Sequence, residues 1–176
     1  MSIAIVPIHA SHADSFHACL DAVAREKRFL AQTQAPPLER IRAFVQEGVS
    51  ADAVQFVAVT SGRVVGWADI FPGWADAVAH CGQLGMGVLA DHRGQGLGGR
   101  LLEACIAKAW QKGITRIELE VRVDNARAIR LYERLGFFRE ATKKHAMRFD
   151  GVYHDTHQMA LLHGFAAGAP AKPAPA

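Results

Sequence analysis

The sequence predicts a single α+β domain built on a mixed, mainly antiparallel sheet flanked by helices. Half of its 176 residues are hydrophobic and 21% are charged, a balance that suits one globular core. Short apolar runs joined by tight turns predict antiparallel neighbours in the first half of the chain. A succession of strand, glycine-rich turn, helix and strand follows between residues 78 and 123, and this order predicts one parallel pair of strands.

The N-terminal part of the chain predicts one strand and two amphipathic helices. Residues 2–8 alternate as a short strand does. Ser11 and Asp14 have the spacing of a capping box at the start of a helix. The prolines at 36 and 37 then break the chain before a second helix. The apolar stripes of these helices are Phe16, Leu20 and Val23 in the first, and Leu38, Ile41, Val45 and Val49 in the second.

Turn residues set the boundaries of the later elements. Ser61-Gly62 and Asp150-Gly151 each join two apolar runs, as two-residue hairpin turns do. Gly113 and Gly136 follow helical stretches, where glycine commonly ends a helix. In order, the predicted elements are strands at 54–60, 63–71 and 78–89, a helix from Gly96 to Lys112, a strand at 114–123, a short helix capped by Asn125, and a closing hairpin of strands at 138–149 and 152–162.

The central feature of the sequence is the glycine-rich turn between the strand at 78–89 and the next helix. Four glycines lie between Gly94 and Gly99, counting both ends. They remove side chains where the first backbone N–H groups of a helix have no partner. These amides and the helix dipole attract an anion, and Arg93 and Arg100 flank the turn. The turn therefore predicts a cradle for a pyrophosphate.

Two common phosphate-binding motifs fit this turn less well. A P-loop requires lysine and then serine or threonine after its last glycine, whereas arginine and leucine follow Gly99. A G-x-G-x-x-G spacing begins at Gly94, but this spacing alone is a weak signal for a dinucleotide fold. The spacing Arg93-x-x-Gly96-x-Gly98, on a strand-to-helix turn, fits better.

This spacing resembles the acetyl-CoA motif of the GCN5-related N-acetyltransferases, the GNAT family. A second block, Asn125-x-x-Ala128-x-x-Leu131-Tyr132-Glu133-x-x-Gly136-Phe137, is similar to the second motif of that family and lies at the expected distance. The order of elements from residue 3 to 162 resembles the family too. The resemblance implies the GNAT fold, with a splayed parallel strand pair, and transfer of an acetyl group from acetyl-CoA to a primary amine.

The resemblance assigns residues to acetyl-CoA. In the splayed gap, backbone groups of Met86, Gly87 and Val88 would bind the pantetheine arm, and an N–H near Val88 would polarise the thioester carbonyl. Tyr132 would protonate the departing thiolate, and Asn125 would hold the pantetheine arm or the acetyl group. The residues that would cradle the diphosphate are Arg93, Gly94, Gln95, Gly96, Leu97, Gly98, Gly99 and Arg100.

The general base stays open at this stage. Several members of the family carry Glu or His on the strand before the cradle, but the matching positions here hold glycine and glutamine. Asp69, His80 and Glu120 lie nearby on the predicted sheet, and ordered water is a fourth alternative.

The acceptor is predicted to be a small-molecule amine, including amino acids. In the family resembled, the first two helices and their connector form a wall of the acceptor pocket. Arg28, Phe29, Gln32 and Gln34 are therefore candidates for substrate contact.

The closing hairpin resembles the branch that acts on amino acids and small amines, including the phosphinothricin N-acetyltransferases. Asp150 and Asp155 are candidates to attract an amine, and Arg148 to pair with a carboxylate. A homodimer through this hairpin is also implied. The alternatives are a protein N-terminal or lysine acetyltransferase, which needs an open groove, and a non-catalytic CoA-binding protein.

Composition argues against several other classes. The net charge is +3 and no basic run contains interleaved aromatics, so nucleic acid is not expected as a partner. There is no run of membrane-spanning length and no signal-peptide pattern, which predicts a cytoplasmic protein. Three scattered cysteines, and histidines at 154 and 157 on opposite sides of a strand, predict no metal site. The domain is expected to span 1–163, and the Ala- and Pro-rich residues 164–176 to form a flexible tail.

Overall fold

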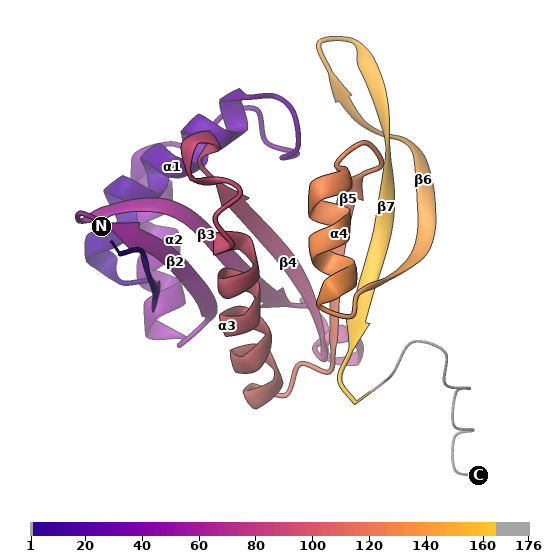
Figure 1. Cartoon of the computed structure of the whole chain (residues 1–176). Coiled ribbons are helices and arrows are strands. Elements are labelled where there is room, and N and C mark those ends of the chain that lie inside the picture. The colour runs from indigo at the N-terminus through magenta and orange to yellow at the C-terminus, as the bar shows by residue number, and fades with distance from the viewer. Residues whose placement is uncertain (1, 165–176) are drawn as a thin grey trace.

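The computed structural model describes residues 2–164, which form one seven-stranded sheet with helices on both faces (Figure 1). All of the predicted tail except Gly164 lies outside these residues. The strand order is β1-β2-β3-β4-β5-β7-β6. The elements are β1 (Ala4–Pro7), α1 (Ala13–Arg25), α2 (Leu38–Ser50), β2 (Val54–Thr60), β3 (Arg63–Pro72), β4 (Cys81–Val88), α3 (Leu97–Gln111), β5 (Arg116–Arg122), α4 (Ala126–Arg134), β6 (Phe138–Phe149) and β7 (Val152–Leu162).

The sheet is antiparallel except between β4 and β5, which confirms the predicted fold class. These two strands pair in parallel over three residues only, from Cys81 to Gln83 on β4 and from Arg116 to Glu118 on β5. Beyond Gln83 they diverge, and Figure 1 shows the opening between them. The remainder of β4, from Leu84 onward, therefore has no strand partner on its β5 side.

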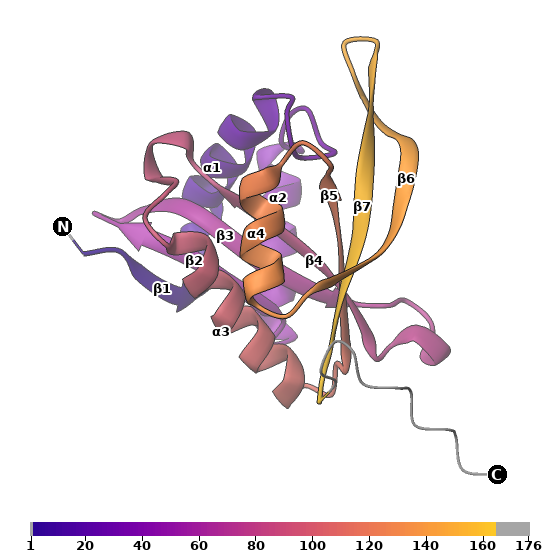
Figure 2. The same ribbon diagram turned by 45° about the vertical axis from the view of Figure 1, so that its right-hand side comes forward.

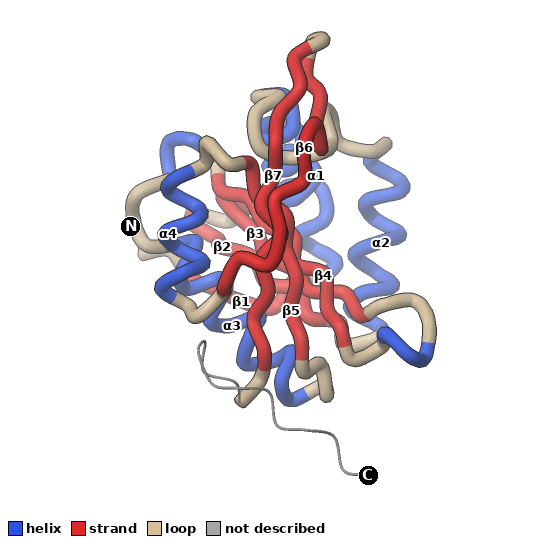
Figure 3. The backbone as a smooth tube through the Cα atoms, turned by 90° about the vertical axis from the view of Figure 1, so that its right-hand side faces the viewer, coloured by secondary structure: helices blue, strands red, loops and turns tan. Residues whose placement is uncertain are grey.

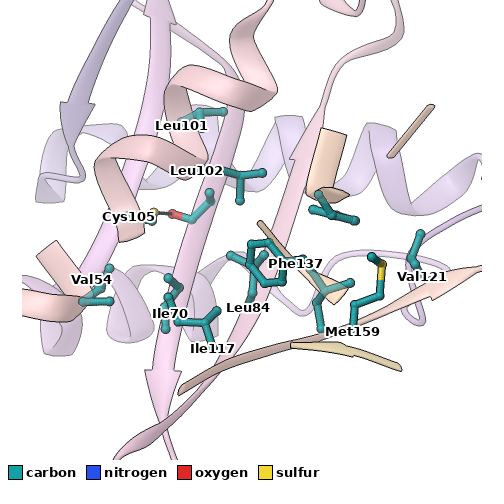
Figure 4. Close-up of a cluster of buried hydrophobic side chains, with 14 of the residues drawn as sticks. Val54, Ile70, Leu84, Leu101, Leu102, Cys105, Ile117, Val121, Phe137 and Met159 are labelled. Carbon is teal, nitrogen blue, oxygen red and sulfur yellow. Dashed lines mark hydrogen bonds between the residues drawn. The ribbon is translucent and has the colours of Figure 1, made fainter. Parts of the chain in front are cut away.

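Helices cover both faces of the sheet. Figure 3 shows the sheet nearly edge-on, with α3 and α4 on one side and α2 on the other, and Figure 2 shows α3 and α4 together in front of it. On the α3 face, Ile70 and Leu84 pack beneath Leu102 in the main core (Figure 4). On the opposite face Trp67 meets Phe16 of α1 edge-on, with ring centroids 5.7 Å apart. Because β3 is buried on both faces, its sequence lacks the apolar–polar alternation of a half-exposed strand.

Two local predictions were wrong. The strand predicted at 78–89 begins only at Cys81, because Val78 belongs to a 3₁₀ turn and the Gly73 N–H bonds the Cys81 carbonyl across the loop. The capping box predicted for Ser11 and Asp14 does not form. A 3₁₀ turn precedes α1 instead, and it is capped by the side chains of His9 and His12.

Within residues 2–164, no helix is long and apolar enough to cross a membrane.

Candidate active site

One large pocket, the central pocket, opens where β4 and β5 diverge. Its volume is about 1420 Å³, above the ~300–1,000 Å³ usual for a pocket that holds one small ligand. Leu84 and Met86 line it from the α3 face of the sheet, while Gly85 and Asp69 line it from the α1 face. The pocket thus reaches both faces through the gap and has room for two reactants.

The glycine-rich turn forms an amide cradle, defined as the backbone N–H groups of residues 94–99. Within the described chain, none of these six groups donates a hydrogen bond; the next amide, that of Arg100, bonds the Gly96 carbonyl at 3.2 Å. Gly94 and Gly96 have φ values of 86° and 76°, which glycine adopts readily. The cradle lies at the N-terminus of α3 and borders the central pocket. It therefore offers unpaired donors and a positive helix end to an anion.

Three side chains predicted for the cradle have other partners. The guanidinium of Arg93 makes two bonds to Glu26, at 2.6 and 3.0 Å, and its Nε donates to the Val88 carbonyl at 2.8 Å. Arg100 donates to the carbonyl of Ile3, and the Gln95 amide to that of Asp91. Neither Arg100 nor Gln95 lines the central pocket. Both flanking arginines are thus paired within the fold, Arg93 at the pocket and Arg100 outside it, and their attraction of the phosphate stays a prediction.

The open edge of β4 presents alternate residues to the gap. The N–H of Leu89 bonds the Val65 carbonyl of β3, and residues that exchange bonds with a neighbour alternate along an antiparallel pair. Gly87 therefore directs its backbone toward β3, whereas Met86 and Val88 direct theirs toward the gap. Since Arg93 takes the Val88 carbonyl, the groups left for a ligand are both backbone groups of Met86 and the N–H of Val88.

Gly87 has a packing role beside Trp67. A Cβ at this position would lie 2.2 Å from the ring of Trp67, its partner in the β3–β4 register. The absence of a side chain at this position therefore makes room for the tryptophan ring. The pairing with β3 sets the alternation of bond directions along β4 and turns the Gly87 backbone toward β3, so its predicted contact with the pantetheine arm stays a prediction.

The two residues predicted for the chemistry both line the central pocket. Tyr132 is 7% exposed, and its hydroxyl has no hydrogen-bond partner among the described residues. Burial raises the pKa of Tyr132 well above its usual value, so the phenol stays protonated at neutral pH. Asn125 caps α4, its Oδ1 accepting from the Ala128 N–H at 3.2 Å, which leaves its NH₂ group for a ligand.

A row of arginines on α4 was missed. Arg127, Arg130 and Arg134 line the central pocket, and none has an ion-pair partner within residues 2–164. Their spacing of three and four places them on one helical face, a signal that was present in the sequence. An Nη of Arg127 lies 2.9 Å from the position of a Cβ on Gly94, which places this guanidinium beside the amide cradle.

The α1 face of the pocket is mostly apolar. Among the connector residues predicted for substrate contact, Phe29 and Gln32 line the pocket, but Arg28 and Gln34 do not. The carbonyl of Arg28 instead accepts from Arg122 at 2.9 Å, which ties the connector to β5. The apolar side chains on this face are Phe16, Leu20, Val23, Phe29, Leu30, Phe44, Trp67 and Phe71.

Arg40 of α2, also missed, lines this α1 face. Its guanidinium makes no hydrogen bond or ion pair with the rest of the described chain, although its backbone N–H bonds the Pro37 carbonyl.

The hairpin residues predicted to bind substrate lie elsewhere. Asp150 pairs with Lys27 at 2.8 Å, and Asp155 pairs with Lys144 at 2.8 Å. Arg148 lies over the ring of Tyr153. None of these side chains lines the central pocket, to which the hairpin contributes Met147. The structure therefore places these candidates outside the central pocket, with Asp150 and Asp155 already ion-paired.

The three side chains considered for the general base differ in their surroundings. His80 is exposed and outside the pocket. Glu120 lines the pocket but is ion-paired with Lys143 and accepts from Thr156. Asp69 also lines the pocket, is partly buried, and has no ion-pair partner in the described chain.

No group of three or more His, Cys, Asp or Glu side chains in the described part of the chain is arranged to hold a metal ion.

A family profile described as the acetyltransferase (GNAT) family matches residues 16–137. The chain belongs to the GNAT family. GNAT enzymes use acetyl-CoA, and the amide cradle with the open edge of β4 has the donors that such a ligand needs. Among solved structures, a GNAT acetyltransferase of Streptococcus pneumoniae has a TM-score of 0.85 at 26% identity, covering 93% of this chain and all of that one. YncA of Salmonella typhimurium, solved with acetyl-CoA, has a TM-score of 0.87 at 20% identity, covering 98% and 100%.

Curated GNAT relatives differ in what their names say they act on. The L-amino acid N-acetyltransferase AaaT of Escherichia coli is 37% identical over 111 residues, which cover 61% of this chain and 67% of that protein. The E. coli ribosomal protein bS18-alanine N-acetyltransferase is 52% identical over 52 residues, 30% of this chain and 34% of that protein. A mycothiol acetyltransferase of Corynebacterium aurimucosum is 46% identical over 52 residues, only 17% of its length.

Proposed function

We propose that this GNAT chain transfers the acetyl group of acetyl-CoA to the primary amine of a small molecule, and that amino acids are the acceptor class it fits best. The observation that carries the proposal is the amide cradle: six unpaired N–H groups at the mouth of a pocket that continues past Tyr132. An anion as large as a diphosphate suits this arrangement. The gap beyond it leads to the opposite face of the sheet.

The roles of individual residues follow from their geometry. The amide cradle holds the diphosphate, and the backbone of Met86 pairs with the pantetheine arm as a neighbouring strand would. The Val88 N–H, which points into the gap, donates to the thioester carbonyl and stabilises the oxyanion that forms on attack. Tyr132 then donates its proton to the departing thiolate. Asn125 orients the arm through its free NH₂ group.

Arg40 supports an amino acid as the acceptor. Its guanidinium is an unpaired cation on the mostly apolar α1 face, so it suits a carboxylate carried by a molecule with an apolar side chain. We expect phenylalanine to be acetylated with a lower KM than phenethylamine, which lacks the carboxylate. Arg40→Gln should raise the KM for phenylalanine about tenfold and leave that for phenethylamine unchanged.

Arg42→Gln is the matched control, since Arg42 lies on the same helix but pairs with Asp14 and Glu39 outside the pocket. Equal KM values for phenylalanine and phenethylamine in the unmodified protein would show that Arg40 does not bind the carboxylate of the acceptor.

A protein acceptor is the second candidate, favoured by the 52% identity to the bS18-alanine enzyme over 52 residues. Thiol release from acetyl-CoA, measured with free amino acids and with peptides that begin with alanine, separates the two. Faster thiol release with the peptides than with free amino acids would favour a protein acceptor over a small-molecule acceptor. Release with no amine at all, despite acetyl-CoA binding, would indicate a non-catalytic protein.

The arginines of α4 are proposed to bind the phosphates of CoA. Arg127→Met should raise the Kd of acetyl-CoA about tenfold and weaken the dependence of Kd on salt, because one charge contact is lost. Arg148→Met, which removes an exposed arginine of the hairpin, is the control. Calorimetry at two ionic strengths measures both effects, and an unchanged Kd in Arg127→Met would exclude the contact.

The homodimer and the cytoplasmic location stay predictions.

A further inference from the structure

We propose that Asp69 is the general base, its carboxylate taking the proton from the acceptor ammonium on the α1 face of the gap. The inference rests on the acetyl transfer proposed above and adds a catalytic residue to it. Of the acidic side chains that line the central pocket, Asp69, Glu26 and Glu120, only Asp69 has no ion-pair partner within the described residues.

The register of the sheet places this carboxylate at the gap. Asp69 of β3 is opposite Gly85 of β4, so both positions face the same side of the sheet. A Cβ on Gly85 would lie 2.8 Å from Oδ1 of Asp69. The carboxylate of Asp69, which is on β3, therefore reaches across β4 into the space that a side chain at Gly85 would fill. The open edge of β4 lies directly beyond it. Gly85, the residue opposite Asp69, immediately precedes Met86, whose backbone faces the gap.

The charges around Asp69 leave it able to exchange a proton. Most other charged side chains that line the pocket on this face are ion-paired: Glu26 pairs with Arg93, Glu120 with Lys143, and Arg122 with Asp124. Arg40 is the unpaired one among them within the described chain. The pKa of Asp69 is raised to about 7, mainly by burial and against the effect of the Gly85 amide. A base with such a pKa both accepts and releases a proton near neutral pH.

The reaction balances with these groups. Asp69 takes one proton from the ammonium, and the freed nitrogen lone pair forms the bond to the thioester carbon. The C–S bond breaks, its electron pair stays on sulfur, and Tyr132 protonates that sulfur. The phenolate recovers its proton from the new N–H₂⁺ group through water, and Asp69 releases its own proton to solvent. The products are the acetamide, CoA thiol and one proton.

Asp69→Asn tests the assignment with little change in shape. The expected result is a loss of roughly 100-fold in kcat/KM at pH 7 with a basic amine, while the Kd of acetyl-CoA stays within twofold. With a hydrazide, which is already neutral at pH 7, the loss should shrink to less than about tenfold. The acidic limb of the kcat/KM profile, with an apparent pKa of about 7 in the unmodified protein, should disappear.

His80→Asn is the control, because His80 is exposed and lies outside the central pocket, and it should keep the activity and the acidic limb. Glu120→Gln should keep the acidic limb, because Glu120 is ion-paired with Lys143. Loss of the fold is not expected in Asp69→Asn. A carboxyl whose pKa is raised in the folded state lowers stability as pH rises from about 4 to about 7, and asparagine does not. The variant should therefore melt at or above the wild-type temperature at pH 8.

The outcomes separate the two proposals. An unmodified protein that acetylates amines, together with an Asp69→Asn variant of equal kcat/KM and equal acidic limb, would overturn the inference and leave the acetyl transfer standing. A similar loss with the hydrazide and the basic amine would also overturn it, because a structural role affects both acceptors alike. An unmodified protein that releases no thiol from acetyl-CoA with any amine would contradict the proposed acetyl transfer itself.

Discussion

Gly96→Glu is expected to raise the Kd of acetyl-CoA roughly 1,000-fold. Nothing lies within 4 Å of a Cβ at Gly96, so the new side chain would extend from the amide cradle into open space. A carboxylate about 4 Å from a phosphate, at an effective dielectric constant near 20, costs about 4 kcal/mol, which corresponds to this factor. Isothermal titration calorimetry measures it directly.

Gly113→Glu is the matched control for this change. Gly113 has a φ of 82° at the other end of α3 and also has nothing within 4 Å of a Cβ, so backbone strain and added charge are the same. It should bind acetyl-CoA normally. Gly96→Ala, which adds strain without charge, should lose far less affinity than Gly96→Glu. Equal affinity in Gly96→Glu and the unmodified protein would mean that the diphosphate binds elsewhere.

Tyr132→Phe is expected to lower kcat roughly 1,000-fold while the Kd of acetyl-CoA stays within about twofold. The substitution removes a hydroxyl that bonds no other described group, so neither folding nor the cradle depends on it. The thiolate then leaves without a positioned proton donor. Because burial raises the pKa of this phenol, its ionisation should not shape the activity profile near neutral pH.

Tyr153→Phe serves as the control, because this residue is the other tyrosine of the chain and is 52% exposed on the closing hairpin. Single-turnover measurement of acetyl transfer, beside calorimetry of binding, separates chemistry from affinity. A Tyr132→Phe variant with full kcat would remove the tyrosine from the mechanism.

The sequence was sufficient for the fold class and for the local backbone geometry of the glycine-rich turn and the Asn125 cap. Patterns that depend on neighbours along the chain, such as the glycine-rich turn and the Asn125 cap, determine local backbone geometry, and the structure has both. The hairpin strands at 138–149 and 152–162 have the predicted bounds because the Asp150-Gly151 turn sets their pairing. The cradle amides are unpaired for the same local reason, since the first turn of a helix lacks acceptors.

The partners of charged side chains depended on tertiary structure. Arg93 looked like a phosphate ligand by position, yet its guanidinium pairs with Glu26, which lies 67 residues away in the sequence. Asp155 looked available to an amine but pairs with Lys144 across the hairpin. Conversely, Arg40 gained its place in the pocket from the packing of α2 on the sheet.

The sequence by itself determined the order of elements, the glycine-rich turn with its unpaired amides and the Asn125 cap, because each arises from bonds or periodicity within a few residues. Only the tertiary structure decided which face of the gap each side chain reaches. It paired β3 with β4 so that Asp69 stands opposite Gly85 and the backbone of Gly87 turns away from the gap. A shift of one residue in that register would reverse every direction, and no local pattern fixes a register between strands that a loop joins.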